Sequence, residues 1–544
     1  MKIVIACPPI RDFYITKHRM TSLGTEVLRQ ILSDLGCEVR VLNFSLGDGG
    51  VHEEHDIFQR KKLMRTQIPL PDELEYLMPY IVKHEIGPVK FFTQYYHWGP
   101  DFSDCAKKIY LEKPDLLCIS SFAYAYAQEA VELSRHVKLL CPELFILAGG
   151  AGPTVHPRYY LEESGIDAVL SGEGGEILDR FIQIFEISRG MENKCNWLLD
   201  KLLEVNLAGL YLAGKRNDGN CHAISIAESK PVPAIVHTEK RNRDIFLSAS
   251  ISRGCPRPCC FCSTHLVHGT AFRKCSIESI ERVLSILYQS KRYNHTERGI
   301  QFHFNFEDDN LLLDPDFLLS ACQTIRRFFP GATFSAENGL DYNLLPPSLA
   351  DRLIHIGFNR FNFSFVSADQ GSLNRQARSG DSLKFTKLVN HIASQNIPVV
   401  SYFIAGFVDD TRQSVVKTIK YLSGLPTRMA VSPYYAVPGT TGFEDVERFL
   451  GKPPRLSLGT SFFNWNDSLS TRCLITIFRL SRIINLAKNK CSNDGRQLLY
   501  RIFTEERLYT LVVEKGNVSF MPVPDMDDEL VHMVISNLEV KEIS

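Results

Sequence analysis

The segment that carries most information on the fold is Ser252-Arg253-Gly254-Cys255-Pro256-Arg257-Pro258-Cys259-Cys260-Phe261-Cys262. Its two prolines are incompatible with a regular helix, so we expect a loop wrapped around a ligand. With Cys275 it accounts for five of the 15 cysteines of the chain. The other cysteines are scattered singly and are expected to pack as small apolar side chains. An odd cysteine count in a long chain without a secretion signal argues against a disulfide framework, so the cluster of cysteines indicates a metal centre.

The spacing of these cysteines favours an iron–sulfur cluster. Thiolates from Cys255, Cys259 and Cys262 are suited to hold three irons of a [4Fe-4S] cubane, which usually takes four cysteine ligands. One iron is then left open for a substrate or a cofactor. Zinc is the competing metal, but structural zinc requires four closed ligands. Cys260 is available as a fourth ligand, although its adjacency to Cys259 makes joint chelation awkward.

Strands and helices alternate around and after this loop. Strands are expected at residues 246–250, 299–304, 333–337, 360–365, 399–405 and 429–434, with helices at 276–289, 315–329, 348–356, 381–394 and 411–422. Six such units predict a partial (β/α)6, TIM-like barrel over residues 245–450 rather than a closed eightfold one. Residues 451–544 form a small C-terminal extension, with a helix near 471–487 and a strand-like run at 508–513.

A second alternation precedes the barrel in residues 1–180. Strands are expected at 2–6, 38–42, 115–121, 144–148 and 168–171, and helices at 21–35 and 126–140. This pattern predicts an α/β, doubly wound (Rossmann-like) domain that binds its ligand at the carboxyl ends of the strands. Residues 46–105 are expected to be an insertion with some helix, and residues 181–244 a connector.

The overall composition excludes several classes of protein. The chain has 61 Lys and Arg against 62 Asp and Glu, a net charge of −1, so it has no field that would draw it onto DNA or anionic membranes. No apolar run approaches the ~20 residues of a membrane-spanning helix. The start of the chain does not resemble a signal peptide. We therefore expect a cytoplasmic, soluble, multidomain protein without a transmembrane segment.

Residues 246–445 resemble the core of radical S-adenosylmethionine (SAM) enzymes, whose hallmark is this three-cysteine loop. The resemblance implies that Cys255, Cys259 and Cys262 hold the cluster, that its open iron binds SAM, and that SAM is cleaved to a 5′-deoxyadenosyl radical. It places Phe261 near the adenine. The other implied cofactor-binding residues are Glu307, Asp309, Ser367, Arg378 and Gly406. Val366 departs from the pattern, because an acidic residue usually precedes the serine.

The N-terminal domain is similar to the cobalamin-binding domain of one subgroup of these enzymes. The matching stretches are Pro8-Pro9, Ser22-Leu23-Gly24, Ser120-Ser121, Gly149-Gly150 and Gly172-Glu173-Gly174-Gly175-Glu176. The resemblance implies cofactor binding by Ser120, Ser121, Gly149, Gly150 and Glu173. The alternative is that the glycines only permit tight strand–helix turns. The motif Asp-x-His-x-x-Gly is absent and His18 has no such frame, so any bound cobalamin is expected to lack a histidine below the cobalt.

The resemblance implies a cobalamin-dependent methyltransferase that acts on an unactivated carbon, using one SAM to methylate cobalamin and a second as the radical source. A radical cyclase, ring-contraction or carbon–carbon-forming enzyme with the same domains is the alternative, followed by a tRNA-modifying or non-catalytic protein. The substrate is a small molecule, lipid or peptide, and an electron donor such as flavodoxin or ferredoxin is implied. Tyr434, Tyr435 and the C-terminal extension are expected to shape the pocket.

Overall fold

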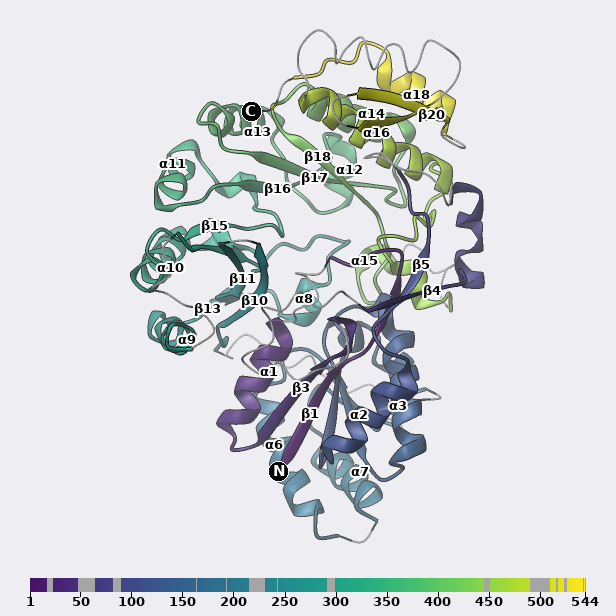
Figure 1. Ribbon diagram of the computed structural model, residues 1–544, viewed down its shortest axis with the longest axis vertical. Coiled ribbons are helices and arrows are strands. Elements are labelled where there is room, and N and C mark those ends of the chain that lie inside the picture. The colour runs from purple at the N-terminus through teal and green to yellow at the C-terminus, as the bar shows by residue number, and fades with distance from the viewer. Residues whose placement is uncertain are drawn as a thin grey trace.

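The computed structural model describes residues 1–16, 23–46, 64–81, 90–162, 164–191, 193–214, 230–241, 243–290, 299–444, 451–489, 509–514, 517–522, 526–541 and 543. The α/β domain lies at one end of the molecule and the barrel-like domain lies above it in Figure 1, with the C-terminal extension at the far end. The expected positions Ser22 and His18 lie outside the described residues.

The N-terminal domain is built on a six-stranded sheet in the order β3-β1-β6-β7-β8-β9. The strands are β1 (Lys2–Cys7), β3 (Glu38–Asn43), β6 (Leu116–Ser120), β7 (Phe145–Gly149), β8 (Ala168–Leu170) and β9 (Leu210–Leu212). The first five run parallel, and β9 pairs antiparallel with β8. The predicted doubly wound sheet is thereby confirmed.

Alternate residues of each strand bury against opposite layers of helices, as the period-2 side-chain direction of a strand requires. Val4 and Ala6 join the core that contains α2 (Phe102–Glu112) and α3 (Ala127–Leu140). Ile3 and Ile5 join the core that contains residues of α1 (Leu23–Asp34), α6 (Gly175–Ser188) and α7 (Lys194–Val205). Both faces of the sheet are therefore covered, which explains its nearly continuous apolar strands.

The stretch expected to be a connector belongs instead to both domains. The expected boundary at residue 180 falls inside α6, and α7 packs in the same core through Leu198 and Leu202. Further on, β10 (Ala234–Arg241) pairs antiparallel with the first barrel strand. The described parts of the stretch 181–244 are therefore corrected from a connector to the end of α6, α7 and β9 of the first domain and β10 of the second.

The expected insertion also contains strands. β2 (Ile10–Asp12), β5 (Tyr95–Trp98) and β4 (Arg65–Ile68) form a small antiparallel sheet, and η3 (Asp72–Tyr80) follows β4. In Figure 1 this sheet lies along one side of the molecule, between the two large domains. Through β2 this sheet joins the start of the chain to β4 and β5, which lie between the two large domains.

The second domain contains the six parallel strands expected of a partial barrel. They are β11 (Asp244–Ser250), β14 (Gln301–Phe306), β15 (Thr333–Ser335), β16 (Phe361–Val366), β17 (Val399–Ala405) and β18 (Arg428–Pro433). They form two sheets, β10-β11-β14-β15 and β16-β17-β18, joined by the parallel bridges Phe334–Phe358 and Leu340–Phe363. Within the described residues no pairing closes the barrel, so it is an open half-barrel.

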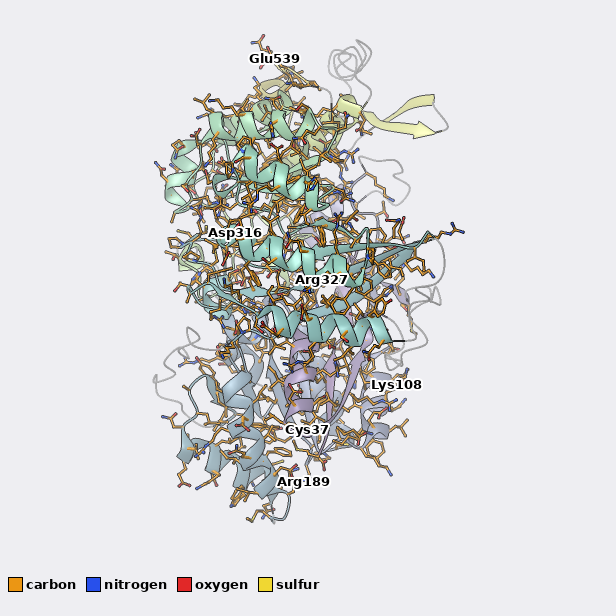
Figure 2. The ribbon with its side chains drawn as sticks, turned by 90° about the vertical axis from the view of Figure 1, so that its left-hand side faces the viewer. Cys37, Lys108, Arg189, Asp316, Arg327 and Glu539 are labelled. Carbon is orange, nitrogen blue, oxygen red and sulfur yellow. The ribbon has the colours of Figure 1, made fainter. Side chains whose placement is uncertain are left out.

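Helices cover the outer face of the half-barrel (Figure 1). They are α9 (Ile277–Gln289), α10 (Pro315–Phe328), α11 (Pro347–Ile356), α13 (Ser382–Ala393) and α14 (Arg412–Ser423). Asp316 and Arg327, both on α10, are labelled in Figure 2 on this outer face. The carboxyl ends of the half-barrel strands face the α/β domain (Figure 1).

The C-terminal extension packs on the last part of the half-barrel. α16 (Thr471–Asn489) contributes apolar residues to the barrel core, while α18 (Asp528–Ile535) and the hairpin β19 (Tyr509–Glu514) and β20 (Asn517–Pro522) follow it. Glu539, labelled at one end of Figure 2, accepts a hydrogen bond through its carbonyl from Ser423 at the end of α14. None of the helices in the described ranges is long and apolar enough to span a membrane.

Shorter elements lie in the loops and are η2 (Phe44–Leu46), η4 (Tyr124–Tyr126), α4 (Ala151–Val155), α5 (Pro157–Leu161), β12 (Ser252–Arg253), α8 (Thr264–Val267), β13 (Arg273–Lys274), η6 (Leu311–Leu313), η7 (Tyr342–Leu344), α12 (Gln370–Arg375), α15 (Thr441–Glu444) and η9 (Pro454–Ser457).

Candidate active site

A cavity of about 540 Å³ lies where the strand ends of the two domains meet. From the α/β domain it is lined by the segment after β1, by the residues after β6 and by α3; from the half-barrel it is lined by the ends of β11 and β14. The residues that line the cavity include Ser120, Ser121, Tyr126, Glu129, Glu307, Asn338 and Tyr435. Tyr435, which was expected to shape the pocket together with Tyr434, lines this cavity, whereas Tyr434 is not among the residues that line it. Ligands of both predicted types, at the carboxyl ends of both sheets, would share this space.

The cysteine loop begins in a tight antiparallel contact between β12 and β13. Gly254 follows β12 with a φ of +86°, and a Cβ there would lie 2.1 Å from the carbonyl oxygen of Ala271. Only glycine fits this close approach and this left-handed conformation. The backbone N–H of Cys255 then donates to the carbonyl of Gly269 at 3.3 Å. The start of the cysteine loop is therefore held by the segment that follows α8.

Two consecutive carboxylates after β14 fix the same loop. Asp308 accepts hydrogen bonds from the backbone N–H of Ile251 at 3.0 Å and from the hydroxyl of Ser252 at 2.6 Å. Asp309 accepts one from the N–H of Gly254 at 2.7 Å. Burial raises the pKa of Asp308 to about 6, although its hydrogen bonds lower it. Asp309, expected at SAM, thus has one carboxylate oxygen bonded to the cysteine loop itself.

The three predicted cluster cysteines lie on this loop with polar neighbours at two of them. Asn310 Nδ2 lies 3.7 Å from Cys255 Sγ, and Arg378 Nη1 lies 3.8 Å from Cys259 Sγ. Burial raises the pKa of both thiols, although Asn310 lowers that of Cys255 and Arg378 lowers that of Cys259.

The donor set of these thiols suits a cluster better than a single zinc ion, because one loop supplies three cysteines, Cys255, Cys259 and Cys262. A zinc ion would need four ligands at about 2.0–2.3 Å, whereas a cubane spreads its cysteines over separate irons. The donor set of three cysteines beside an arginine and an asparagine therefore fits [4Fe-4S].

Cys260 points elsewhere. Its thiol lies 3.5 Å from the carbonyl oxygen of Arg375, and its backbone N–H donates to the carbonyl of Gln376 at 3.3 Å. Its own carbonyl accepts from the N–H of Gly442. These contacts attach the loop to the segments after β16 and β18. Cys260 therefore helps to hold the loop in place, next to the three cysteines predicted to bind the cluster.

The other positions implied by the radical SAM resemblance fall into two groups. Phe261 packs against Phe407 with ring centroids 5.4 Å apart, and Gly406, just after β17, has a φ of +98°. Arg378 contacts the cysteine loop at Cys259, whereas Glu307 lines the cavity and accepts from Asn305 Nδ2 at 2.6 Å.

Ser367 lies apart from them. It is buried, its hydroxyl lies 3.2 Å from that of Thr418, and it accepts from the N–H of Asp369. These bonds close the turn after β16. Just before it, Val366 has a φ of +72°, a conformation that a β-branched residue rarely adopts. The departure from the family pattern at Val366 therefore coincides with a strained turn.

The predicted cobalamin residues also divide into two groups. Ser120 and Ser121 line the cavity, but Ser121 Oγ is 2.8 Å from the hydroxyl of Tyr160 and is buried. A Cβ on Gly150 would lie 2.5 Å from the carbonyl of Ser121, so its glycine is explained by packing. A Cβ on Gly149 would meet nothing closer than 3.7 Å. Packing therefore does not require glycine at position 149, where a Cβ would make only an ordinary contact with the carbonyl of Leu170.

Glu173 lies at the domain boundary rather than among the cavity-lining residues. Its carboxylate accepts hydrogen bonds from Arg273 at 2.7 and 2.8 Å, and from His268 at 2.8 Å. Both partners belong to the half-barrel, just after the cysteine loop. A position predicted for cofactor binding is therefore an inter-domain ion pair in this structure.

A buried acidic network at the cavity was not predicted from the sequence. Asp12 accepts from the hydroxyls of Tyr126 at 2.7 Å and Thr460 at 2.6 Å, and burial raises its pKa to about 6. Glu129 pairs with Arg455 at 2.9 Å while its Oε2 has no hydrogen-bond partner. The only sequence signal for this network was polarity within apolar segments, because its members come from distant parts of the chain.

Comparison with known proteins supports both domain assignments. Residues 94–182 match the family model described as a B12 binding domain. The chain is 27% identical over 353 residues to an uncharacterized methyltransferase of Pyrococcus horikoshii, covering 63% of this chain and 72% of the relative. It is 24% identical over 217 residues to the bacteriochlorophyllide d C-12(1)-methyltransferase of Chlorobaculum tepidum, covering 39% and 44% of the two chains.

The fold has a solved counterpart. The radical SAM methyltransferase TsrM of Kitasatospora setae, solved with cobalamin and a [4Fe-4S] cluster, matches with a TM-score of 0.55 and 14% identity, covering 82% of this chain and 78% of TsrM. Residues 94–182 thus match a B12-binding domain, and the chain as a whole shares the fold of TsrM. The relatives that it resembles in sequence are named as methyltransferases.

Proposed function

We propose that this protein is a cobalamin-dependent radical SAM methyltransferase that acts on an unactivated carbon of its substrate. The observation that carries the proposal is the shared cavity, in which Ser120 after the B12-domain strand β6 and Glu307 after the half-barrel strand β14 line one space. A methyl donor held by one domain and a radical source held by the other would reach a substrate between them. Such positioning is the main contribution of a protein to cofactor chemistry.

Each domain supplies residues for one group. When bound, the cluster and SAM supply a 5′-deoxyadenosyl radical after one-electron reduction, and cobalamin supplies the methyl group. Cys255, Cys259 and Cys262 would hold three irons, with Arg378 beside Cys259 balancing the negative charge of the thiolates. The electron would come from a donor such as flavodoxin or ferredoxin.

Apolar side chains would keep water from the radical. Phe261 packs on Phe407, whose ring centroid lies 5.2 Å from that of Tyr434. This aromatic row extends from the cysteine loop to the end of β18. Excluding water protects a reactive intermediate from side reactions.

On the B12 side, Ser120 lines the cavity and would offer its hydroxyl to the corrinoid. No histidine is present among the described residues that line the cavity. The expectation that cobalt lacks a protein imidazole below it therefore remains part of the proposal.

The decisive experiment follows the products of SAM. Anaerobic protein with cluster, cobalamin, reductant and methyl-labelled SAM is incubated with a candidate substrate, and nucleosides are separated by chromatography. We expect one S-adenosylhomocysteine and one 5′-deoxyadenosine for each labelled product, because the methyl donor and the radical source are separate SAM molecules.

The alternative radical cyclase or rearrangement enzyme has no use for the methyl group. Turnover that yields 5′-deoxyadenosine without S-adenosylhomocysteine, and leaves the substrate unlabelled, would favour it. Wild-type protein that retains no corrinoid would contradict the methyltransferase proposal itself.

A further inference from the structure

A bidentate ion pair joins the two domains next to the cysteine loop. Glu173 comes from the loop after β8 of the B12 domain. It receives both Nη atoms of Arg273 in a bidentate pair and the ring Nδ1 of His268. Paired forks of this kind fix the orientation of both partners as well as their distance.

The two partners of Glu173 in the half-barrel, Arg273 and His268, are also hydrogen-bonded to each other, and the Glu173–Arg273 pair is largely buried. Arg273 Nη2 also donates to the carbonyl of His268 at 2.8 Å. The side chain of Arg273 is 8% exposed and that of Glu173 is 19% exposed. Burial alone would raise the pKa of Glu173, yet the hydrogen bonds from Arg273 and His268 lower it to about 2. The carboxylate therefore stays charged at every physiological pH.

The segment that Glu173 holds is the one that supports the cluster cysteines. Arg273 is the register partner of Arg253 in the β12–β13 pair, two residues before Cys255. Gly269, next to His268, accepts the hydrogen bond of the Cys255 N–H. A shift of the segment 268–273 would therefore move the start of the cysteine loop.

We infer that Glu173 is a positioning residue that sets the placement of the cluster loop relative to the B12 domain. This function rests on the proposed chemistry, in which cobalt and the radical must reach one substrate carbon at the same time. A displacement of about 1 Å at a reacting centre is enough to cost about a hundredfold in rate. The Glu173–Arg273 pair would limit such displacement across the domain boundary.

The test measures the separation of the two cofactors directly. The full chain is loaded with cluster and cobalamin, and pulsed electron paramagnetic resonance records the distance distribution between the reduced cluster and cob(II)alamin. We expect E173A and E173Q to keep iron and corrinoid contents near those of the wild type while the distance distribution broadens or shifts. The matched control is E281Q on the outer helix α9, where Glu281 pairs with Arg327 at the surface.

A second readout tests the functional consequence. Loss of the pair should increase the 5′-deoxyadenosine released per methylated product by about tenfold or more, because radical formation no longer coincides with a correctly placed methyl donor. R273M should behave like E173A, and the E173A/R273M double variant should be no worse than either single one. Unchanged distance distributions and unchanged coupling in stable E173A would overturn the inference.

Hydrogen exchange separates this inference from the proposed function. In the full chain without cobalamin, the amides of residues 252–275 should exchange faster in E173Q than in wild type or E281Q. If wild-type protein binds no corrinoid but this difference is seen, the positioning contact stands and the methyltransferase proposal fails. Equal exchange in E173Q and wild type would refute the contact even if methylation occurs.

Discussion

At the scale of single residues, the cysteine loop contains two adjacent thiols with different surroundings. Cys259 is buried beside the guanidinium of Arg378, whereas Cys260 faces the carbonyl of Arg375. The spacing of the motif predicts Cys255, Cys259 and Cys262 as ligands, because three cysteines within one loop form a local pattern. The sequence named Asp309 only as a cofactor-binding residue and did not name Asp308, because the bonds of both to the loop form only when β14 lies beside β11.

This difference leads to a prediction on iron content. C255A, C259A and C262A should each lose the cluster and the cleavage of SAM, because a cubane held by two thiolates is not retained. C260A should keep about the wild-type iron content and brown colour. Iron analysis and the visible absorption spectrum of anaerobically purified protein check this. Loss of iron in C260A with retention in C259A would reverse our ligand assignment.

At the scale of elements, the sequence predicted best the strands and helices that are buried on long apolar faces. β17 was expected at 399–405 and is Val399–Ala405, and α10 was expected at 315–329 and is Pro315–Phe328. β9 has only three residues and β10 carries polar side chains in a charged stretch, so neither shows an alternation that marks a strand. Their positions follow from pairing with distant strands, which a local pattern does not contain.

One helix terminus depends on a lysine far away in the chain. Lys488 of α16 is fully buried and its Nζ donates to the carbonyls of Leu422, Leu425 and Thr427 at the end of α14, at 2.7 to 2.8 Å. K488M leaves these carbonyls without that donor, and each buried unsatisfied group costs about 1–3 kcal/mol. We therefore expect a loss of about 3 kcal/mol or more of unfolding free energy, measured by denaturant unfolding.

The control for this substitution is K417M on α14. Lys417 is more than half exposed and pairs with Asp369 at the surface, where such pairs contribute about 1 kcal/mol or less. K417M should therefore unfold close to the wild type. Equal stability of K488M and K417M would show that the carbonyls at the end of α14 find other donors.

At the scale of the whole molecule, the C-terminal extension is part of the structure of the cavity. Arg455 in η9 pairs with Glu129 of α3 at 2.9 Å and with Glu73 of η3 at 2.7 Å. Thr460 donates to Asp12, a contact between residues 448 positions apart. The domains and their order were predictable from motifs, but this network was not, because it requires three segments to meet around one buried arginine.

The network also makes stability depend on pH. Burial raises the pKa of Glu129 while Arg455 lowers it. In R455M the remaining carboxylates of Glu129 and Glu73 lose their cation, and breaking a buried pair in this way costs about 3–5 kcal/mol. The pKa of Glu129 in the folded state then rises further above its unfolded value. A raised carboxyl pKa means that the folded state holds its proton more tightly, so the penalty shrinks at low pH and grows as pH rises through the folded pKa.

We therefore expect the midpoint of thermal unfolding of R455M to fall below that of the wild type, by more at pH 8 than at pH 5. The compensating variant is R455M/E129Q, which removes the charge that the arginine left unpaired. Its stability should lie above that of R455M at pH 8, and its difference from wild type should depend less on pH. A pH-independent deficit in R455M that E129Q does not relieve would mean that Arg455 acts through packing, and that its charge does not hold the three segments together at the cavity.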